Sequence, residues 1–410
     1  MAGGARRVSI WQRALSWLSG PMTATDARLY EALGGTETHT AESVSVTSVM
    51  GLSTAWACVN LLAGTMASLS LDMNRKDERQ VRIPSPEHPL QRVLNDPNAD
   101  QTGIDFWEQM HLALELWGNA YARIDRNGGV ITALTPVRPE VMQVERMRSG
   151  ALRYTWYDDG RNQVGEDDIL HIRGNGGDPM GGMSTIAWNR NTFGSAQAIE
   201  RAAGKTFANG IRSSGAFVAE RDLTPEQMAQ ASERIDQKYV GAMNAGRPMF
   251  LNNGLKYVPI SFKPEEAQML ESRGFSVEEI CRVFGVPPFA VGHTEKVTSF
   301  GSGLEQQLLW FQKTALRKRA KKVEQSIRKQ LLSPEDRRAG YGVSHNFEDF
   351  LRTDTKARAE FYKIMTDIKA YTINDVLAIE GRAPKPWGDE PWVQMQDEQL
   401  SERERDNEQA

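Results

Sequence analysis

Residues 52–71 form a run of twenty positions without a charged side chain, and this run limits the folds open to the chain. Twenty uncharged residues are long enough to cross a bilayer as a helix. The large apolar residues, however, recur at helical spacing, and Thr54, Asn60, Thr65 and Ser68 lie between them. A helix with one apolar and one polar face is typical of a protein core. We therefore expect a buried helix over 52–71 rather than a membrane span.

The charge balance and the cysteine count argue against several classes of protein. The 410 residues include 49 Lys and Arg against 53 Asp and Glu, which gives a net charge of −4. A strongly basic protein that coats nucleic acid by neutralising phosphates is therefore excluded. The two cysteines, Cys58 and Cys281, are too few for a disulfide scaffold or a four-thiolate zinc site.

Catalytic and cofactor motifs do not stand out in this sequence. The six histidines have no metal-ligand spacing, and there is no GxSxG sequence. Gly204-Lys205-Thr206 is similar to the end of a phosphate-binding loop, but Ile199 stands where that motif needs Gly. We expect a protein that is not an enzyme and that uses no cofactor or metal.

The hydrophobic period changes several times along the chain and predicts an α+β fold. Helical spacing over 104–117 ends at Gly118, and residues 119–173 have a period of two. Asn127-Gly128-Gly129 indicates a hairpin within that stretch. The other predicted elements are a glycine-rich joint at 174–182, a helix at 184–209, an insert at 212–262, a helix from Pro264 to Phe284, a loop at 291–303, a helix at 304–332, a strand at 341–347, a helix through Phe361 and Tyr371, and a short helix capped by Thr372 and Asp375.

Small residues are frequent in the predicted helix 184–209. Such residues let neighbouring backbones approach closely, so we expect this helix to pack against another helix. The residues expected at that contact are Gly194, Ala198, Ala202 and Gly204.

The predicted helix 304–332 contains the main concentration of charge. Eight cations and two carboxylates give it a net charge of +6. One interpretation is a solvated face or a set of ion pairs between subunits, and the other is a surface that meets a polyanion. The central cations of this helix are Arg317, Lys318, Arg319, Lys321 and Lys322.

Five groups of short blocks resemble, in order and spacing, the portal protein family of tailed bacteriophages, in its HK97-like branch. The resemblance covers about residues 45–385. Its blocks are Ala55-Trp56-Ala57-Cys58-Val59-Asn60 with Leu69-Ser70-Leu71, His88-Pro89-Leu90 with Pro97-Asn98, Gly118-Asn119-Ala120-Tyr121, Phe284-Gly285-Val286-Pro287-Pro288 with Val291-Gly292 and Glu305-Gln306, and Tyr371-Thr372-Ile373-Asn374-Asp375 with Gly381-Arg382-Ala383-Pro384. Two positions depart from the family: Ser184-Thr185 replaces a frequent Ser-Pro, and the later long helix lacks a Pro near Arg319.

The resemblance implies a portal architecture. The expected parts are a flexible N-terminal arm at 1–44, an α/β wing at 45–182 with 333–354, two stem helices at 183–211 and 263–287, an α/β clip at 212–262, a tunnel loop at 288–303, a long channel-to-wing helix at 304–332, crown helices at 355–392 and a disordered tail at 393–410.

The same resemblance implies the function. The family forms a twelve-subunit ring at one capsid vertex of the virion, assembled in the host cytoplasm, through which double-stranded DNA passes during packaging and ejection. The implied partners are the major capsid protein, the terminase motor and the head–tail connector proteins. The resemblance implies no contact with a membrane. The residues then expected at the DNA channel are His293, Lys296, Ser299 and Ser302, and the cations Arg317 to Lys322 would line the channel or a subunit interface.

Two other interpretations remain open at this point. One is a hydrolase with its site in the β-rich part, which lacks a supporting motif. The other is a membrane-associated scaffold that uses residues 8–18 and 52–71.

Overall fold

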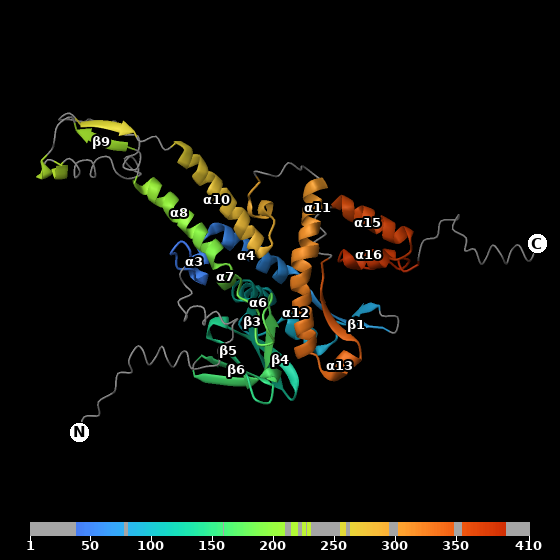
Figure 1. Cartoon of the computed structure of the whole chain (residues 1–410). Helices are drawn as coiled ribbons and strands as arrows, with labels where there is room; N and C mark the ends of the chain where they lie inside the picture. The colour runs from blue at the N-terminus through green and yellow to red at the C-terminus, as the bar shows by residue number, and fades with distance from the viewer. Residues whose placement is uncertain are drawn as a thin grey trace, which may run out of the picture. The chain divides into compact units, whose positions relative to one another are not determined.

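The computed structural model describes residues 38–77, 81–158, 160–209, 215–219, 224–226, 228–230, 255–259, 263–294, 302–347 and 355–390. The chain divides into two compact units, Met1–His345 and Asn346–Ala410, and each is described by itself. Both contain helices, and strands are found in the first unit (Figure 1).

The uncharged run forms a buried helix, as the sequence predicts, but a shorter one. Helix α4 (Ser53–Ser68) follows the short α3 (Val46–Met50), and its buried residues include Cys58, Leu62 and Met66. The helix ends because Leu69 takes an extended conformation, and strand β1 starts at Leu71. Among the described helices, none is long and apolar enough to cross a membrane.

Three of the small sheets are antiparallel and belong to the β-rich part of the first unit. The first has the order β11-β1-β2, and its register places Met73 opposite Val343, so residues 270 positions apart become neighbours. The second has the order β4-β3-β8 and the third β5-β6-β7. The strands are β1 (Leu71–Lys76), β2 (Arg82–Pro84), β3 (Asn119–Asn127), β4 (Val130–Val137), β5 (Gln143–Arg146), β6 (Leu152–Tyr157), β7 (Arg161–Gly165), β8 (Ile169–Arg173) and β11 (Tyr341–His345).

The predicted hairpin and the predicted helix stop are both confirmed. Gly128 and Gly129 join β3 to β4 with φ values of 58° and 87°, which a two-residue hairpin turn of this kind requires. Gly118 ends helix α6 (Gly103–Trp117) with a φ of 71°. A Cβ atom at Gly118 would collide with the carbonyl oxygen of Met183, so this position needs glycine for two reasons.

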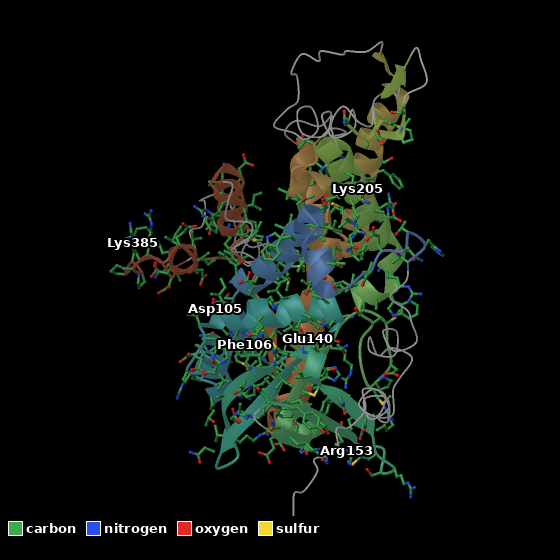
Figure 2. All side chains as sticks on the ribbon, turned by 90° about the vertical axis from the view of Figure 1, so that its left-hand side faces the viewer. Asp105, Phe106, Glu140, Arg153, Lys205 and Lys385 are labelled. Atoms are coloured by element: carbon green, nitrogen blue, oxygen red, sulfur yellow. The ribbon has the colours of Figure 1, made fainter. Side chains whose placement is uncertain are left out.

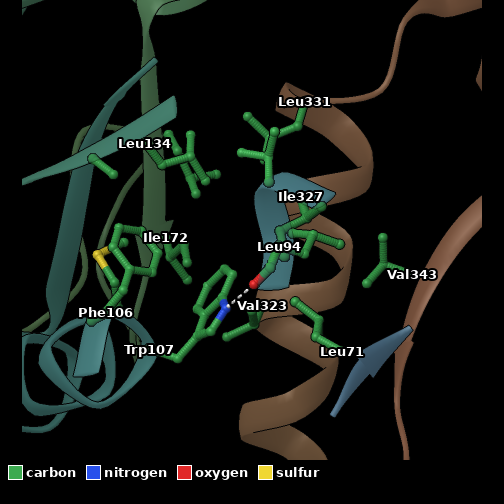
Figure 3. Close-up of a cluster of buried hydrophobic side chains, with 14 of the residues drawn as sticks. Leu71, Leu94, Phe106, Trp107, Leu134, Ile172, Val323, Ile327, Leu331 and Val343 are labelled. Carbon is green, nitrogen blue, oxygen red and sulfur yellow. Dashed lines mark hydrogen bonds between the residues drawn. The ribbon is translucent and has the colours of Figure 1, made fainter. Parts of the chain in front are cut away.

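The main core lies between helices α5 (Pro89–Asn95), α6 and α12 (Arg317–Gln330) and the first two sheets. Figure 3 shows Trp107 in this core, where its Nε1 donates a hydrogen bond of 3.0 Å to the carbonyl oxygen of Leu94. Val323 and Ile327 of α12 face the same cluster. One side of α12 is therefore part of the hydrophobic core.

The predicted helix 184–209 is interrupted near its start. Helix α7 (Thr185–Trp188) ends at Asn189, and α8 (Arg190–Asn209) follows. Ser184 begins α7: its hydroxyl accepts from the Ala187 amide at 3.2 Å and donates to the Leu116 carbonyl at 3.0 Å. This serine caps the helix at the position where the resemblance led us to expect Ser-Pro.

Helix α8 packs beside α10 (Lys263–Phe284), as Figure 1 shows. The rings of Phe193 and Phe284 lie 6.0 Å apart between them, and α10 also contacts α4, where the Sγ atoms of Cys58 and Cys281 are 3.8 Å apart. In Figure 2, Lys205 near the end of α8 lies far from Arg153 of β6. Between α8 and α10 in sequence, β9 (Gly215–Ala219) and β10 (Leu255–Pro259) form an antiparallel pair.

The long predicted helix 304–332 is not one continuous α-helix, which corrects the expectation. Helix α11 (Ser302–Phe311) leads into a π-helical turn at Gln312–Leu316 and then into α12 (Arg317–Gln330). The wider turn coincides with a five-residue step in the apolar stripe, from the buried Phe311 to the buried Leu316, where the other steps are three or four residues. The short α13 (Pro334–Arg338) connects α12 to β11.

The second unit contains a pair of helices, α15 (Thr355–Asp367) and α16 (Ile373–Ile379). The predicted cap of the last helix is confirmed. The Asp375 amide donates to the Thr372 hydroxyl at 3.1 Å, and the Asp375 carboxylate accepts from the Thr372 amide at 2.7 Å.

One end of the expected N-terminal arm is packed, contrary to the expectation of flexibility over 1–44. Thr38 and Glu42 are each 7% exposed, and the Glu42 amide donates to the Thr38 hydroxyl at 3.0 Å. Other predictions lie outside the described residues: the arm over 1–37, the strand near 249–251, most of the insert 212–262, the loop over 295–301 and the tail at 393–410.

Candidate functional site: the faces of the basic helix

All five predicted basic residues lie on helix α12, but they fall into sets with different surroundings. Their spacing places Arg317 and Lys318 on the side away from the core, and both are exposed. Arg319 and Lys322 lie at the border of the buried side, where they contact other parts of the first unit. The two sets must therefore be considered separately.

Arg319 is an internal structural residue. Its guanidinium binds the carboxylate of Glu115 on α6 through Nε at 2.5 Å and Nη2 at 2.8 Å. It also donates to the carbonyl oxygens of Phe284 at 2.9 Å and Ala315 at 3.1 Å. The side chains of Arg319 and Glu115 are only 17% and 9% exposed. A paired charge of this kind joins α6, α10 and α12 and is not available to a polyanion.

Lys321 and Lys322 are also held within the chain. Lys321 pairs with Glu324, and Lys322 donates to the carbonyl oxygen of Gly174 and, at 3.3 Å, to the Asn175 side chain. Burial, together with the charges of Lys318 and Arg319, lowers the pKa of Lys322. The glycine-rich joint at 174–182 is thus fastened to α12.

Glu324 forms the centre of a buried polar group. It accepts hydrogen bonds from the amide of His345 at 3.0 Å and from the imidazole Nδ1 at 3.2 Å. Burial by itself would raise the pKa of this carboxyl, but the hydrogen bonds from His345 and Lys321 outweigh burial and hold the pKa at about 2. Glu324 therefore stays ionised and ties α12 to the last strand of the first unit.

Five cations remain on the outer face. They are exposed, and none forms an ion pair or a side-chain hydrogen bond with the residues that the structure describes: Lys313, Arg317, Lys318, Arg328 and Lys329. Lys329 lies sixteen positions after Lys313, and at 1.5 Å of rise per residue these charges extend over about 24 Å. Such a row of unpaired cations attracts an anionic partner.

The loop after α10 contains the residues predicted at the DNA channel, and the structure describes two of them, His293 and Ser302. His293 does not stand free: its Nε2 lies 3.8 Å from the Glu278 carboxylate of α10, and a Cβ atom at Gly274 would be 3.7 Å from its Cε1. Ser302 begins α11. Lys296 and Ser299 lie outside the described residues.

The small residues of α8 also separate into two groups. Gly194 is buried, and a Cβ atom there would lie 2.7 Å from the Thr38 side chain, so the segment 38–50 of the same chain covers it. Arg201 reaches Glu42 at 2.6 Å, and Gln197 reaches Ser48 at 2.9 Å, along the same side. Ala202 and Gly204 are exposed and Ala198 is half-buried. Ala202 and Gly204 thus remain accessible to another helix.

Two buried groups were missed by the sequence reasoning. Glu115, the partner of Arg319, lies four residues after His111 on α6. This pair of polar residues at i, i+4 spacing was the signal by which the sequence could have indicated a buried polar contact. His171 is fully buried, with its ring between Tyr154 at 3.2 Å and Asn119 at 3.0 Å, and burial lowers its pKa. Across the described part of the chain, no group of three or more His, Cys, Asp or Glu residues could hold a metal ion.

Comparison with known proteins decides the family. A family model described as "Phage portal protein" matches residues 53–381. The chain belongs to the phage portal protein family. The "Portal protein" of Enterobacteria phage HK97 is 32% identical over 393 residues, which cover 94% of this chain and 92% of that protein. The "Probable portal protein" of Streptomyces phage phiC31 is 31% identical over 363 residues, covering 85% and 78%.

The fold of this portal protein is also similar to a solved structure. A chain in the structure titled "Neck of native GTA particle computed with C12 symmetry" has a TM-score of 0.57 and 21% identity, and the match covers 92% of this chain and all of that one. Portal proteins are structural components of the virion and not enzymes. The surfaces of this chain that face other molecules therefore matter more than any catalytic group.

Proposed function

We propose that this portal protein forms a ring of twelve copies at one vertex of the capsid and provides the passage for double-stranded DNA during packaging and ejection. Family membership supports this proposal, together with the similarity to a chain in a neck that was computed with C12 symmetry. The wing at 45–182 with 333–354 and the outer stem helices would meet the major capsid protein. The clip at 212–262 would dock the terminase motor and later the connector proteins.

The single observation that carries the proposal is the division of charges on α12. A DNA passage must not bind its cargo tightly, because each neutralised phosphate adds affinity and would slow sliding. Three of the five central cations are held inside the chain, Arg319 and Lys321 by carboxylates and Lys322 by neutral oxygen atoms, while the outer face keeps Arg317 and Lys318. The outer cations would meet DNA or an acidic surface of the neighbouring copy with a charge density that still permits movement.

The tunnel loop at 288–303 would act at the narrowest part of the passage. Within this loop, His293 lies 3.8 Å from the Glu278 carboxylate of α10. Lys296, Ser299 and Ser302 would then contribute the side chains nearest to DNA. A loop with one cation per copy and small hydroxyl side chains would contact phosphates without reading base edges.

Electron microscopy of the purified full chain tests the ring directly. Top views should show closed particles with twelve-fold symmetry and a central hole wider than a DNA duplex. Monomers only, at a concentration of several milligrams per millilitre, would contradict the proposal.

A second experiment tests the loop in a packaging reaction with capsids and terminase. Replacing residues 295–301 by three glycines should leave ring formation unchanged and reduce DNA packaging or retention at least tenfold. As a matched control, a chain with the same seven residues changed to Gly or Ser at full length separates loss of length from loss of Lys296 and Ser299. Normal packaging by the shortened chain would contradict the role of the loop.

A further inference from the structure

The helical pair at 355–390 has no hydrophobic core of its own. Among its described residues, no apolar side chain is buried, and Phe361, Ile364, Ile368 and Trp387 are 42%, 58%, 63% and 48% exposed. A unit of this size buries too little surface to be stable by itself. Phe361, Ile364 and Ile368 therefore have apolar surface left for a contact outside this pair.

Polar contacts, together with a contact of 6.1 Å between the rings of Phe361 and Tyr371, hold the pair together and leave much of the apolar side exposed. Glu380 of α16 accepts from Tyr362 at 2.8 Å and pairs with Arg358 at 3.3 Å, both on α15. Asn374 holds the segment that follows: its side chain donates to the Lys385 carbonyl at 2.9 Å and accepts from the Lys385 amide at 2.7 Å. Because the polar side of α15 faces α16, the residues at 361, 364 and 368 form a separate stripe at helical spacing.

The stripe has an acidic edge. Glu360 and Asp367 lie seven residues apart, which is two helical turns, and so both fall along one side of the stripe. Both are exposed, and neither is paired with a residue that the structure describes. Lys363 lies beyond this edge, farther from the stripe.

A second segment of the same unit is both basic and aromatic. Arg382 and Lys385 follow α16 and are exposed. The Lys385 ammonium lies 5.2 Å from the centre of the Trp387 ring, so this patch combines a large apolar surface with positive charge. Tryptophan and arginine are the residues that contribute most often to the centre of protein interfaces.

We propose that the stripe Phe361, Ile364 and Ile368 of one copy packs on the patch Arg382, Lys385 and Trp387 of a second copy of this chain. This inference rests on the ring in the proposed function and names a surface through which its copies meet. The two surfaces are complementary in charge, since Glu360 and Asp367 border the stripe and Arg382 and Lys385 border Trp387. Because every copy presents both surfaces, the contact is head-to-tail, which forms a ring when the rotation between neighbouring copies closes.

Cross-linking between two differently tagged chains tests the contact. One chain carries Ile364→Cys and the other Trp387→Cys, and a short bismaleimide joins them when each thiol adds across one maleimide double bond, without any oxidant. The native Cys58 and Cys281 are buried, and the parent chain measures their background. The mixture should give a product with both tags, and a mixture of Lys363→Cys with Trp387→Cys should give at least tenfold less.

Charge reversal tests the same contact without cysteines. Glu360→Lys with Asp367→Lys should raise at least tenfold the protein concentration at which half of the chains are in rings, and Arg382→Glu with Lys385→Glu should do the same. Combining all four changes in one chain should restore assembly at least partly.

The outcomes separate this inference from the proposed function. If the parent forms rings but the two-tag product is absent and both reversals assemble normally, the contact is wrong and the ring stands. A chain that carries both Ile364→Cys and Trp387→Cys and cross-links only within itself would also overturn the contact, because the stripe would then be covered by its own chain. If the parent gives no rings and the cysteine pair gives no two-tag product, both proposals fail.

Discussion

The inner and outer faces of α12 carry the same residue types but have opposite surroundings. On the inner side, Arg319 is bound to Glu115 and to two carbonyl oxygens, and Glu324 binds His345. On the outer side, Arg317 and Lys318 are exposed and have no ion-pair partner in the described part of the chain. Charge on the inner face therefore contributes to the folded unit, and charge on the outer face is left for other molecules.

This difference shows why a count of basic residues is a poor guide to a binding surface. A buried cation that loses its partner is costly, whereas an exposed cation adds little to stability. The variants below should therefore separate stability from assembly along one helix.

The largest effect is expected for Arg319→Met. Removal of the guanidinium leaves the carboxylate of Glu115 buried and unpaired, so the free energy of unfolding should fall by about 3–5 kcal/mol. Urea unfolding followed by circular dichroism measures this change. Arg317→Met is the matched control and should change stability by less than about 0.5 kcal/mol. Equal losses in the two variants would remove the distinction between the faces.

The next effect concerns pH and His111, which lies beside the inner face. Burial, followed by the charges of His345 and Arg319, lowers the pKa of His111 to about 3. Unfolded histidine titrates near pH 6.5, so between pH 6.5 and pH 3 the unfolded chain binds more protons, and stability is lost as the pH falls. From pH 7.5 to pH 5 the parent should lose about 2 kcal/mol more than His111→Leu.

Urea unfolding of both proteins at the two pH values checks this expectation. The Nδ1 atom of His111 has no hydrogen-bond partner among the described residues, so leucine removes little beyond the titration. The same pH dependence in parent and variant would contradict a neutral, buried His111.

A smaller effect on stability is expected on α8, where Gly194 is covered by the chain and Gly204 is exposed. Gly194→Ala forces a methyl group against Thr38 and should destabilise the unit by about 1–2 kcal/mol. Gly204→Ala meets no atom within 4 Å and should stabilise the helix by up to about 1 kcal/mol. Thermal unfolding of the two variants measures the difference, and a stabilised Gly194→Ala would show that segment 38–50 does not press on α8.

The smallest effect on stability is expected on the outer face. Arg317→Glu with Lys318→Glu should change the free energy of unfolding by about 0.5 kcal/mol or less. The same variant should reduce ring formation or DNA packaging, which electron microscopy and a packaging reaction would detect. Arg328→Glu with Lys329→Glu is the matched change at the other end of the helix. Full assembly and packaging by both variants would leave the outer face as ordinary solvated surface.

Local features of this fold could be predicted because a few neighbouring residues determine them. Gly118 ends a helix and Gly128-Gly129 turns a hairpin because both positions need a backbone conformation that glycine allows. The cap at Thr372 and Asp375 needs only residues three apart. The break at Asn189 and the π-helical turn at Gln312–Leu316 were missed because each apolar pattern was interpreted as one continuous helix, although the five-residue step from Phe311 to Leu316 is a signal of the wider turn.

The sequence by itself determined the buried helix at the uncharged run, the order of helices and strands, the family, and the presence of a basic helix near the C-terminal end. Only the tertiary structure decided which of its cations are free, because the partner of Arg319 lies 204 residues away and that of Lys322 lies 147 or more residues away. Periodicity assigns a residue to a side of a helix, but a contact over such a separation depends on how α6, β8 and α12 pack together.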